Sequence, residues 1–372
     1  MRLVLVGGGT AGHIFPTIAV AEQTAKMAGS TADLTAVCGS RDLDRLLYRD
    51  VDLEVLPLSA RGLVGVDWWR LPWRVWLLIQ SLYSIWRDFS RQRPAAVIAS
   101  GGYVSVPVLL VSWVRRIPSV IFSGDAALGW ATRVMAPLTS VATIAFEEAR
   151  TQIWRTPVEQ TGYPVRASFA APDAAAGRAE LGVSRCEPLI VVMGGSQGAH
   201  VINTALRAAL GRLLPKAHVV HICGSRDYRS LTSDRDRLPA SLRQRYHLHA
   251  FIEHGFADML AAADVVVSRA GATSVAELSA VGTAAVLIPG TFGAGHQIAT
   301  ARAMAAAGAA LMLPEAELSS GGLVSTLLDL LDDPKRRGSI GAASLSRGQP
   351  DAAARIAAIG LRLAGHPTTA DA

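Results

Sequence analysis

Short apolar runs alternate with longer amphipathic stretches along the whole chain. Residues 2–6 (RLVLV) lead into a glycine-rich turn and a helix-like stretch, and residues 189–193 (LIVVM) begin a second copy of this plan. A short apolar run bounded by turn residues is typical of a strand buried on both faces, as in parallel sheets. Strand, glycine turn and helix, occurring twice, therefore predict two similar halves.

Further apolar runs predict the remaining strands of each half. They lie at about 33–38, 53–57, 95–99, 118–122 and 140–145 in the first half, and at about 217–223, 245–250, 264–268, 284–288 and 309–313 in the second. Helical patterns separate them, so we predict an α/β fold with two Rossmann-like, doubly wound parallel sheets. Because ligands bind outside the carboxyl ends of such strands, the halves are expected to face each other across a cleft.

Turn residues from Thr161 to Pro164 interrupt the pattern and predict the boundary between the halves. The first domain is expected to span residues 1–161 and the second residues 162–349. Residues 350–372 are expected to form a closing helix that packs back toward the first domain, followed by a frayed tail.

The composition fits two well-covered domains. The 372 residues exceed the usual size of one hydrophobic core, and 50% are hydrophobic while 18% are charged. Apolar stretches stay shorter than the roughly 18 residues that cross a bilayer, so a cytoplasmic location is expected. Cys38, Cys186 and Cys223 show no metal-site spacing and are expected in the core. The net charge of +6 favours an anionic partner, which nucleic acid, anionic lipid and nucleotides all satisfy.

The first glycine turn formally matches a dinucleotide-binding fingerprint. Gly7 to Gly12 fit G-x-G-x-x-G, but the second expected strand ends without the acidic residue that holds a ribose, so a nicotinamide or flavin enzyme is disfavoured. Glycines at a helix N-terminus still admit a phosphate or sugar, because free N–H groups and the helix dipole favour negative charge. His13 follows the turn directly and suits a general base or hydrogen-bonding group, or it simply caps the helix.

The glycine turn of the second half lacks the Gly-Lys-Ser/Thr ending of a P-loop, so ATP hydrolysis is disfavoured. Ser196 and Gln197 there offer a neutral cradle for a diphosphate, or form an ordinary strand-to-helix turn. Ser274 and Glu277 have the spacing of a helix capping box; alternatively, Glu277 accepts hydrogen bonds from both hydroxyls of a ribose. His296-Gln297 follow a glycine-rich segment, from which they can reach a diphosphate or sugar.

Two Asp-x-Asp triplets, at 42–44 and 234–236, have the spacing to hold a divalent cation on a nucleotide diphosphate. Both lie in polar surroundings, outside the glycine turns. We therefore interpret them as solvated acids near helix starts and expect no metal site.

Five of the eight tryptophans cluster in one stretch, at Trp68, Trp69, Trp73, Trp76 and Trp86. Aliphatic residues and several arginines surround them, a mixture that suits the headgroup region of an anionic bilayer. Nucleic-acid stacking uses similar residues, but this stretch is too aliphatic for a strand-binding groove. It therefore predicts a membrane-facing surface, the alternative being a buried helix that closes the first half.

With these motifs in view, the sequence resembles the MurG family of peptidoglycan glycosyltransferases, in glycosyltransferase family 28, over nearly its whole length. The motifs that carry the resemblance are Gly8-Gly9-Thr10-Ala11-Gly12-His13, Ser100 to Pro107, Gly162-Tyr163-Pro164-Val165-Arg166, Gly194 to Ala199, and Gly271 to Glu277 with His296-Gln297. Each motif is moderately specific, whereas five in register are strong evidence.

The resemblance implies a GT-B fold, with an acceptor- and membrane-binding first domain and a UDP-sugar-binding second domain. It implies inverting, metal-independent transfer of N-acetylglucosamine from UDP-N-acetylglucosamine to the C4 hydroxyl of undecaprenyl-pyrophosphoryl-N-acetylmuramyl-pentapeptide, a step of peptidoglycan synthesis. The expected partners are these two substrates and the anionic inner-membrane surface, without cofactor or nucleic acid. The expected location is the cytoplasmic face of the bacterial cell membrane, as a peripheral protein.

The resemblance also implies roles for single residues. His13 and Asp125 are the catalytic candidates, Glu277 holds the ribose, and Gln297 contacts the sugar. Ser196, Gln197 and Arg166 position the diphosphate. The further donor contacts are Thr10, Gly12, Ile252 and His296, in addition to His13 and Asp125. The acceptor contacts are Gly9, Tyr103 and Ser105. The membrane patch comprises Trp68, Trp69, Trp73, Trp76 and Leu77.

The chain departs from the family at Phe122-Ser123-Gly124-Asp125, where His-Glu-Gln-Asn is usual. The family's asparagine helps to read the sugar, and Asp125 exchanges this amide for a carboxylate. Because an acid in a cleft can have a raised pKa, Asp125 is a candidate for the base itself. Ala11 and Thr300 also replace a usual glycine and asparagine. These changes leave open another lipid or secondary metabolite as the acceptor, or a non-catalytic UDP-sugar-binding relative.

Overall fold

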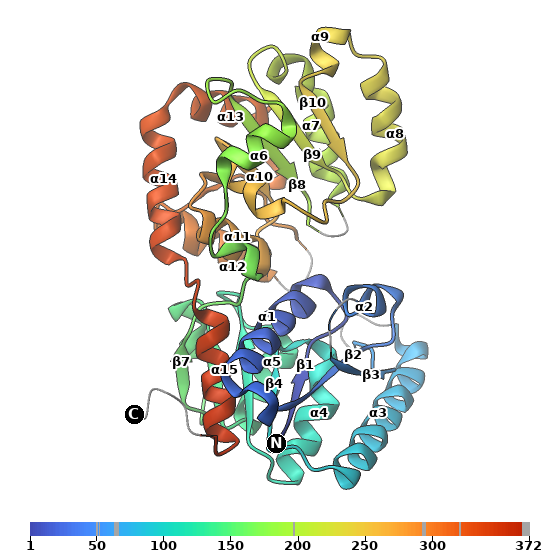
Figure 1. The fold of residues 1–372 in the computed structure, drawn as a ribbon. Coiled ribbons are helices and arrows are strands. Elements are labelled where there is room, and N and C mark those ends of the chain that lie inside the picture. The colour runs from blue at the N-terminus through green and yellow to red at the C-terminus, as the bar shows by residue number, and fades with distance from the viewer. Residues whose placement is uncertain are drawn as a thin grey trace. The chain divides into compact units, whose positions relative to one another are not determined.

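The computed structural model describes residues 1–49, 51, 53–62, 67–195, 198–291, 295–319 and 321–366. The chain forms two compact units (Figure 1). Unit 1 combines residues 1–167 with the chain from Gln349 onward, and unit 2 spans Ser168–Gly348. Each unit has its own parallel sheet and its own buried core.

The sheet of unit 1 has seven parallel strands in the order β3-β2-β1-β4-β5-β6-β7. Their bounds are β1 Arg2–Val6, β2 Asp33–Gly39, β3 Glu54–Leu58, β4 Ala96–Ala99, β5 Ser119–Ser123, β6 Val141–Ile144 and β7 Val158–Gln160. The order reverses between β1 and β4, which pair in register from Leu3 opposite Ala96 to Val6 opposite Ala99. The loops that follow these two strands therefore share the switch point where open α/β sheets bind ligands.

Helices cover both faces of this sheet. Their bounds are α1 Ala11–Ala28, α2 Asp42–Leu47, α3 Leu71–Arg91, α4 Gly102–Val114, α5 Trp130–Met135 and α15 Ala352–Leu363, with short 3-10 turns at Gly29–Thr31, Trp68–Arg70, Ala136–Leu138, Glu147–Gln152 and Ala167–Phe169. Helices α3 and α4 pack together and contribute Ile85, Phe89 and Val108 to one core. Helix α15 packs against α1 (Figure 1), and Leu361 joins Leu3 and Ala96 in a separate cluster.

Unit 2 repeats the plan with six parallel strands in the order β10-β9-β8-β11-β12-β13. The strands are β8 Leu189–Met193, β9 His218–Ile222, β10 Tyr246–His249, β11 Val265–Ser268, β12 Ala285–Leu287 and β13 Leu311–Met312. The helices are α6 Ala174–Leu181, α7 His200–Leu213, α8 Ser225–Asp236, α9 Ala240–Arg243, α10 Phe256–Ala262, α11 Ala272–Val281, α12 His296–Ala306, α13 Gly322–Asp332 and α14 Pro334–Arg347, with a 3-10 turn at Glu315–Glu317. Here the order reverses between β8 and β11, so the second glycine turn also lies at a switch point.

The prediction of an α/β fold with two doubly wound parallel sheets is confirmed. The observed change of unit falls between Ala167 and Ser168, later than the boundary expected between residues 161 and 162, and Gln349 belongs to unit 1. Gly162 explains the difference: with φ at +85°, its Cα lies against α15, and an added Cβ would be 2.2 Å from the Cβ of Gln349. Residues 162–167 thus stay packed on unit 1.

The structure also bears on two further expectations, one about the cysteines and one about membrane-spanning helices. Cys38 and Cys223 are buried, but Cys186 is exposed and does not belong to the core, because it lies in the turn before β8. Within the described part of the chain, no helix combines the length and the apolar character that a bilayer crossing requires.

Candidate functional site

The first glycine turn runs from β1 into α1 and is held closely by its neighbours. Gly9 has φ at +87°, and an added Cβ would lie 2.5 Å from the hydroxyl oxygen of Tyr103, so both its conformation and its surroundings require glycine. The exposed Thr10 is the N-cap of α1. The turn therefore presents the start of an 18-residue helix beside the Tyr103 ring.

Asp44 fixes this turn from helix α2, which follows the neighbouring strand β2, and this corrects its interpretation as a solvated acid. Its side chain is fully buried, and Oδ1 accepts hydrogen bonds from the backbone N–H of Gly9 at 2.6 Å and of Gly39 at 3.0 Å. Arg41 donates to the carbonyl oxygen of Gly9 at 3.1 Å. The partners are distant in sequence and meet only because β1 and β2 pair, so the spacing of the acids alone does not reveal them.

His13 lies in the first turn of α1, against the second glycine motif of unit 1. A Cβ added to Gly102 would lie 2.9 Å from Nε2 of His13, so the imidazole packs on the backbone at the start of α4. Burial lowers the pKa of His13, and a hydrogen bond with the backbone of Ser100 acts in the opposite direction. The ring is therefore neutral near pH 7 and suits orientation of a hydroxyl group better than storage of a proton.

Asp125 follows β5 at the same edge of the sheet, where β5 pairs beside β4. Its carboxylate makes no hydrogen bond or ion pair with any residue that the structure describes. Burial raises the pKa of Asp125 to about 6. A partly buried, unpaired carboxylate with a pKa near neutrality has the properties of a general base.

The two acceptor candidates on α4 differ in their surroundings. Tyr103 is partly exposed, packs its ring against Gly9 and lies with its ring centroid 5.7 Å from the guanidinium carbon of Arg41. Ser105 is buried, and its hydroxyl donates to the carbonyl oxygen of Gly101. Ser105 thus helps to hold the glycine turn, and its contact with the acceptor stays a prediction.

Arg166 belongs to unit 1, although its motif was assigned to the second half. The guanidinium carbon of Arg166 lies 4.7 Å from the ring centroid of Phe15 on α1. In the same segment, the hydroxyl of Tyr163 donates to the carbonyl oxygen of Gly12 at 2.6 Å. Unit 1 thus carries six of the site candidates around the carboxyl ends of β1, β4 and β5. They are Thr10, Gly12, His13, Tyr103, Asp125 and Arg166.

The donor candidates of unit 2 follow the carboxyl ends of its strands. Ser196 and Gln197 lie outside the described residues. Ile252 is partly buried in the loop after β10, and α12 begins at His296 after Gly295. Gln297 is already engaged, because its side-chain oxygen accepts from the backbone N–H of Gly290 at 2.9 Å.

Glu277 is buried in α11, and the structure excludes the capping box as its explanation. Helix α11 begins at Ala272 with Gly271 as its N-cap, so Ser274 lies inside the helix. The side chain of Glu277 faces inward with Val275 and Leu278, and Glu277 is 4% exposed. A buried carboxylate in the second turn of a helix can accept several hydrogen bonds, so its ribose contact stays a prediction.

A chain of buried polar side chains, which sequence reasoning missed, connects the second glycine turn with β9 and β10. Asn203 on α7 donates to the carbonyl oxygen of Cys223 and to Oδ2 of Asp227, each at 2.8 Å. Its side-chain oxygen lies 3.0 Å from Nε2 of His221, whose Nδ1 lies 2.8 Å from the hydroxyl oxygen of Tyr246. The signal in the sequence was a histidine inside the apolar run of β9.

These contacts determine which ring nitrogen of His221 carries the hydrogen. An amide oxygen only accepts, so Nε2 carries the hydrogen and Nδ1 accepts from Tyr246. Burial lowers the pKa of His221 to about 4, which agrees with a neutral ring. A Cβ added to Gly198 would lie 2.2 Å from the carbonyl oxygen of Cys223, so the same chain of contacts supports the glycine turn.

The tryptophan-rich stretch is exposed, which excludes a fully buried helix. Trp68 is 80% exposed and Trp73 61%, while Ile85 and Phe89 on the opposite face of α3 are buried. Leu77 is buried with them, so it does not belong to the exposed membrane patch in which it was expected. The buried residues of α3 are spaced along the side of the helix that faces the core: Leu77, Ser81, Ile85 and Phe89. An apolar groove of about 460 Å³ continues from α3 to Leu110 and Val114 of α4.

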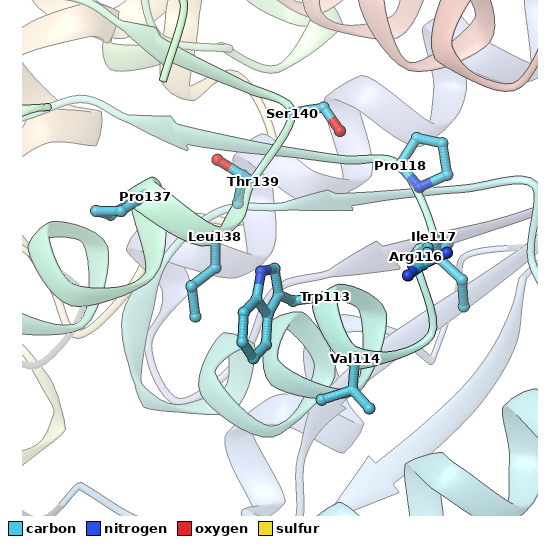
Figure 2. A pocket seen from close by; sticks show the side chains of 9 residues that line it. All are labelled: Trp113, Val114, Arg116, Ile117, Pro118, Pro137, Leu138, Thr139 and Ser140. Carbon is cyan, nitrogen blue, oxygen red and sulfur yellow. The ribbon is translucent and has the colours of Figure 1, made fainter. Parts of the chain in front are cut away.

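A larger hollow lies away from the candidate site. Figure 2 shows its lining, which includes Trp113 of α4, Arg116 and Leu138, and its volume is about 760 Å³. The loops that precede β5 and β6 form it, so it opens at the amino-terminal edge of the sheet, opposite the glycine turns. Among the described residues, no group of three or more His, Cys, Asp or Glu side chains is placed to hold a metal ion.

Comparisons with known proteins agree with this arrangement. The model of the glycosyltransferase family 28 N-terminal domain matches residues 3–143, and that of the C-terminal domain matches residues 189–356. A UDP-N-acetylglucosamine--N-acetylmuramyl-(pentapeptide) pyrophosphoryl-undecaprenol N-acetylglucosamine transferase from Salinibacter ruber is 36% identical over 370 residues, covering 98% of this chain and 97% of the relative.

Solved structures show the same fold. MurG from Acinetobacter baumannii superposes with a TM-score of 0.75 at 22% identity, covering 97% of this chain and 99% of that one. A UDP-GlcNAc 2-epimerase from Neisseria meningitidis, bound to UDP-GlcNAc, superposes with a TM-score of 0.69 at 13% identity, covering 97% and 100%. The two-unit architecture is therefore that of GT-B proteins.

Proposed function

The chain belongs to glycosyltransferase family 28, and on that premise we propose that it transfers N-acetylglucosamine from UDP-N-acetylglucosamine to undecaprenyl-pyrophosphoryl-N-acetylmuramyl-pentapeptide. The curated relative named for this reaction matches nearly the full length of both chains. The observation that carries the proposal is the unpaired carboxylate of Asp125 beside two glycine turns in unit 1, combined with a buried Glu277 in the second turn of α11 in unit 2.

Unit 1 supplies the groups that activate the acceptor. The C4 hydroxyl of the muramyl sugar gives its proton to Asp125 as its oxygen attacks the anomeric carbon of the donor. The bond from that carbon to the β-phosphate oxygen breaks, and UDP leaves with the electron pair. Attack opposite the leaving group inverts the anomeric centre. His13, whose pKa is lowered by burial, orients the hydroxyl as a neutral hydrogen-bonding partner.

Unit 2 supplies the groups that hold the nucleotide. The buried Glu277 accepts hydrogen bonds from the ribose hydroxyls, and the start of α7, a helix of 14 residues, faces the diphosphate. The backbone N–H groups and dipole of this helix stabilise the developing negative charge without a cation. Transfer is therefore expected to continue in excess EDTA, and activity that disappears and returns only with Mg²⁺ or Mn²⁺ would overturn this part of the proposal.

The exposed face of α3 supports attachment of the enzyme to a membrane surface. Its tryptophans and arginines suit the headgroup region of an anionic bilayer, so we propose peripheral attachment to the cytoplasmic face of the bacterial membrane, where the lipid-linked acceptor is held.

The deciding experiment measures transfer of radiolabelled N-acetylglucosamine to the purified lipid-linked muramyl acceptor. Asp125→Asn is expected to lower kcat by about 100-fold or more, the usual range for a general base, and His13→Ala by a smaller factor. Diacylglycerol serves as the control acceptor. Transfer to diacylglycerol but not to the muramyl lipid would contradict the proposed acceptor.

A further inference from the structure

A small pocket in unit 1 lies beside the glycine turns but is not part of them. It has a volume of about 180 Å³ and is lined by Leu78 of α3, Tyr103 and Val106 of α4, Trp130 and Ala131 of α5, and Arg61 of the loop after β3. A cavity of roughly 150 Å³ lined by apolar side chains holds a molecule of the size of benzene. The pocket therefore has room for one small apolar group.

Three arginines surround the same tyrosine. The guanidinium carbon of Arg41 lies 5.7 Å from the Tyr103 ring centroid, Arg61 lines the pocket with Tyr103, and Arg74 is bonded to Gly62, which also lines it. All three charges act to lower the pKa of Tyr103, which burial raises. Arg41 donates to the carbonyl oxygen of Gly9, and Arg74 donates to that of Gly62 at 3.3 Å. These contacts hold two of the guanidinium groups at the pocket.

The arginines lack acidic partners. None of the three forms an ion pair with a carboxylate in the described part of the chain. The one acid whose charge also reaches Tyr103 is Asp44, and Oδ1 of that carboxylate already accepts from two backbone N–H groups. Positive charge that is held in place without a counter-charge favours an anionic ligand, and the start of α4 adds free backbone N–H groups to it.

The pocket lies between two features of unit 1 that bear on its ligand, the glycine turns and helix α3. Tyr103 packs on Gly9, and Gly102 packs on His13, so the groups proposed for activation of the acceptor hydroxyl lie on one side. Leu78 belongs to α3, whose neighbouring turns expose Trp76 and Ile79. The pocket, with Arg61 in its lining, therefore adjoins both the hydroxyl-binding groups and an apolar helix face.

We propose that this pocket binds the first isoprenoid unit of the acceptor and that Arg61, with Arg41 and Arg74, binds its diphosphate. The ligand class is a prenyl diphosphate ester, and the assignment rests on the proposed function. Trp130, which is half exposed at the rim, and Leu78 supply the apolar contact.

Steady-state kinetics with two soluble acceptors test the proposal. Both carry the muramyl-pentapeptide diphosphate, one with a ten-carbon prenyl chain and one with a methyl group. Trp130→Ala is expected to raise the KM of the prenyl acceptor about tenfold and to change that of the methyl acceptor less than about twofold. Arg61→Gln is expected to raise both about tenfold. The KM of UDP-N-acetylglucosamine should stay the same, since neither residue lies on unit 2.

Trp154→Ala and Arg155→Gln are the matched controls, because both residues are exposed on unit 1 and line neither the pocket nor the tryptophan-rich stretch. Calorimetric titration with geranyl diphosphate tests binding without turnover: Arg61→Gln and Trp130→Ala should weaken it at least about tenfold, and the controls should not. An unchanged affinity in both variants would overturn the pocket assignment. Absence of transfer by the wild type, with geranyl diphosphate binding still sensitive to Arg61, would instead overturn the proposed reaction alone.

Discussion

At the scale of single residues, burial gives the two catalytic candidates different properties. Burial favours the uncharged form of each group, so it raises the pKa of Asp125 to about 6 and lowers that of His13. Asp125 is ionised above pH 6 but still binds a proton more strongly than an exposed aspartate. His13 is driven toward its neutral form. The same physical cause thus makes the acid the better base and the histidine a hydrogen-bonding group.

The pH dependence of kcat/KM separates these roles. If Asp125 is the base, kcat/KM rises with pH through about 6 and is flat above it, because only the ionised carboxylate accepts the proton. The ascending limb should disappear in Asp125→Asn, which retains little activity at any pH. A pH–rate profile of the wild type and His13→Gln checks this. A limb that survives Asp125→Asn and shifts in the histidine variant would assign the base to His13.

The same shift has a consequence for stability. The folded pKa of Asp125, about 6, lies above the value of roughly 3.9 in an unfolded chain, so the folded state loses stability as pH rises through that range. Asp125→Asn removes this cost and should raise the free energy of unfolding by on the order of 2 kcal/mol above pH 7 and by nothing near pH 3. Urea titrations at both pH values test this, with Asp42→Asn, an exposed acid, as the control. An equal effect at both pH values would contradict it.

Which residues the sequence reveals depends on how far apart their partners lie. His13 and Glu277 stand next to glycine turns, so local spacing was enough to select them. Asp44 looks like an ordinary acid at a helix start, because its partner Gly9 becomes a neighbour only when β1 and β2 pair. For Ser274 the local spacing misleads in another way. Its distance to Glu277 along the chain matches a capping box, but the helix begins earlier, after Gly271.

At the scale of elements, strands buried on both faces were predicted well because such strands are continuously apolar. The strands from β1 to β6 lie within a few residues of the expected positions. β7 was missed, since Val158–Gln160 is a short edge strand that is only partly buried and contains two polar residues. The helix α3 was recognised, but only the structure shows which of its faces is covered.

The chain of contacts around Asn203 links several elements and sets the position of the α7 start. Asn203→Ala removes the hydrogen bonds that Asn203 makes with the N–H of His221 and the carbonyl oxygen of Cys223, which costs about 1–3 kcal/mol of stability. Because the glycine turn rests on Cys223, the KM of UDP-N-acetylglucosamine should rise about tenfold, while the KM of the acceptor stays the same.

Arg207→Ala is the matched control for this variant, because Arg207 lies on the same helix and pairs with Asp234 at the surface. Kinetics in both substrates and urea unfolding give the required comparison. Equal increases in both KM values would indicate a general loss of folded enzyme, and would remove the specific link between Asn203 and the donor.

At the scale of the whole molecule, unit 1 carries an apolar surface that a protein in water rarely exposes. Trp68, Trp69, Trp73, Trp76, Ile79, Tyr83 and Trp86 are exposed along α3 and the turn before it, and Trp113 and Val114 are exposed at the end of α4. A contiguous patch of this kind marks a protein or membrane contact. The net charge of +6 favours an anionic surface among these.

Vesicle sedimentation tests this surface directly. Trp73→Ser combined with Trp76→Ser should weaken binding to vesicles with anionic lipid by about tenfold or more, because two large aromatic groups no longer enter the interface. Trp154→Ser, which changes an exposed tryptophan outside this stretch, should leave binding unchanged. Added salt should weaken the wild type on anionic vesicles and have little effect on neutral ones, since the arginines act through screened charge. If the exposed face of α3 binds only the membrane, transfer to a short-chain soluble acceptor should be unaffected in the double variant. A parallel loss of soluble activity would place these tryptophans in the acceptor site instead.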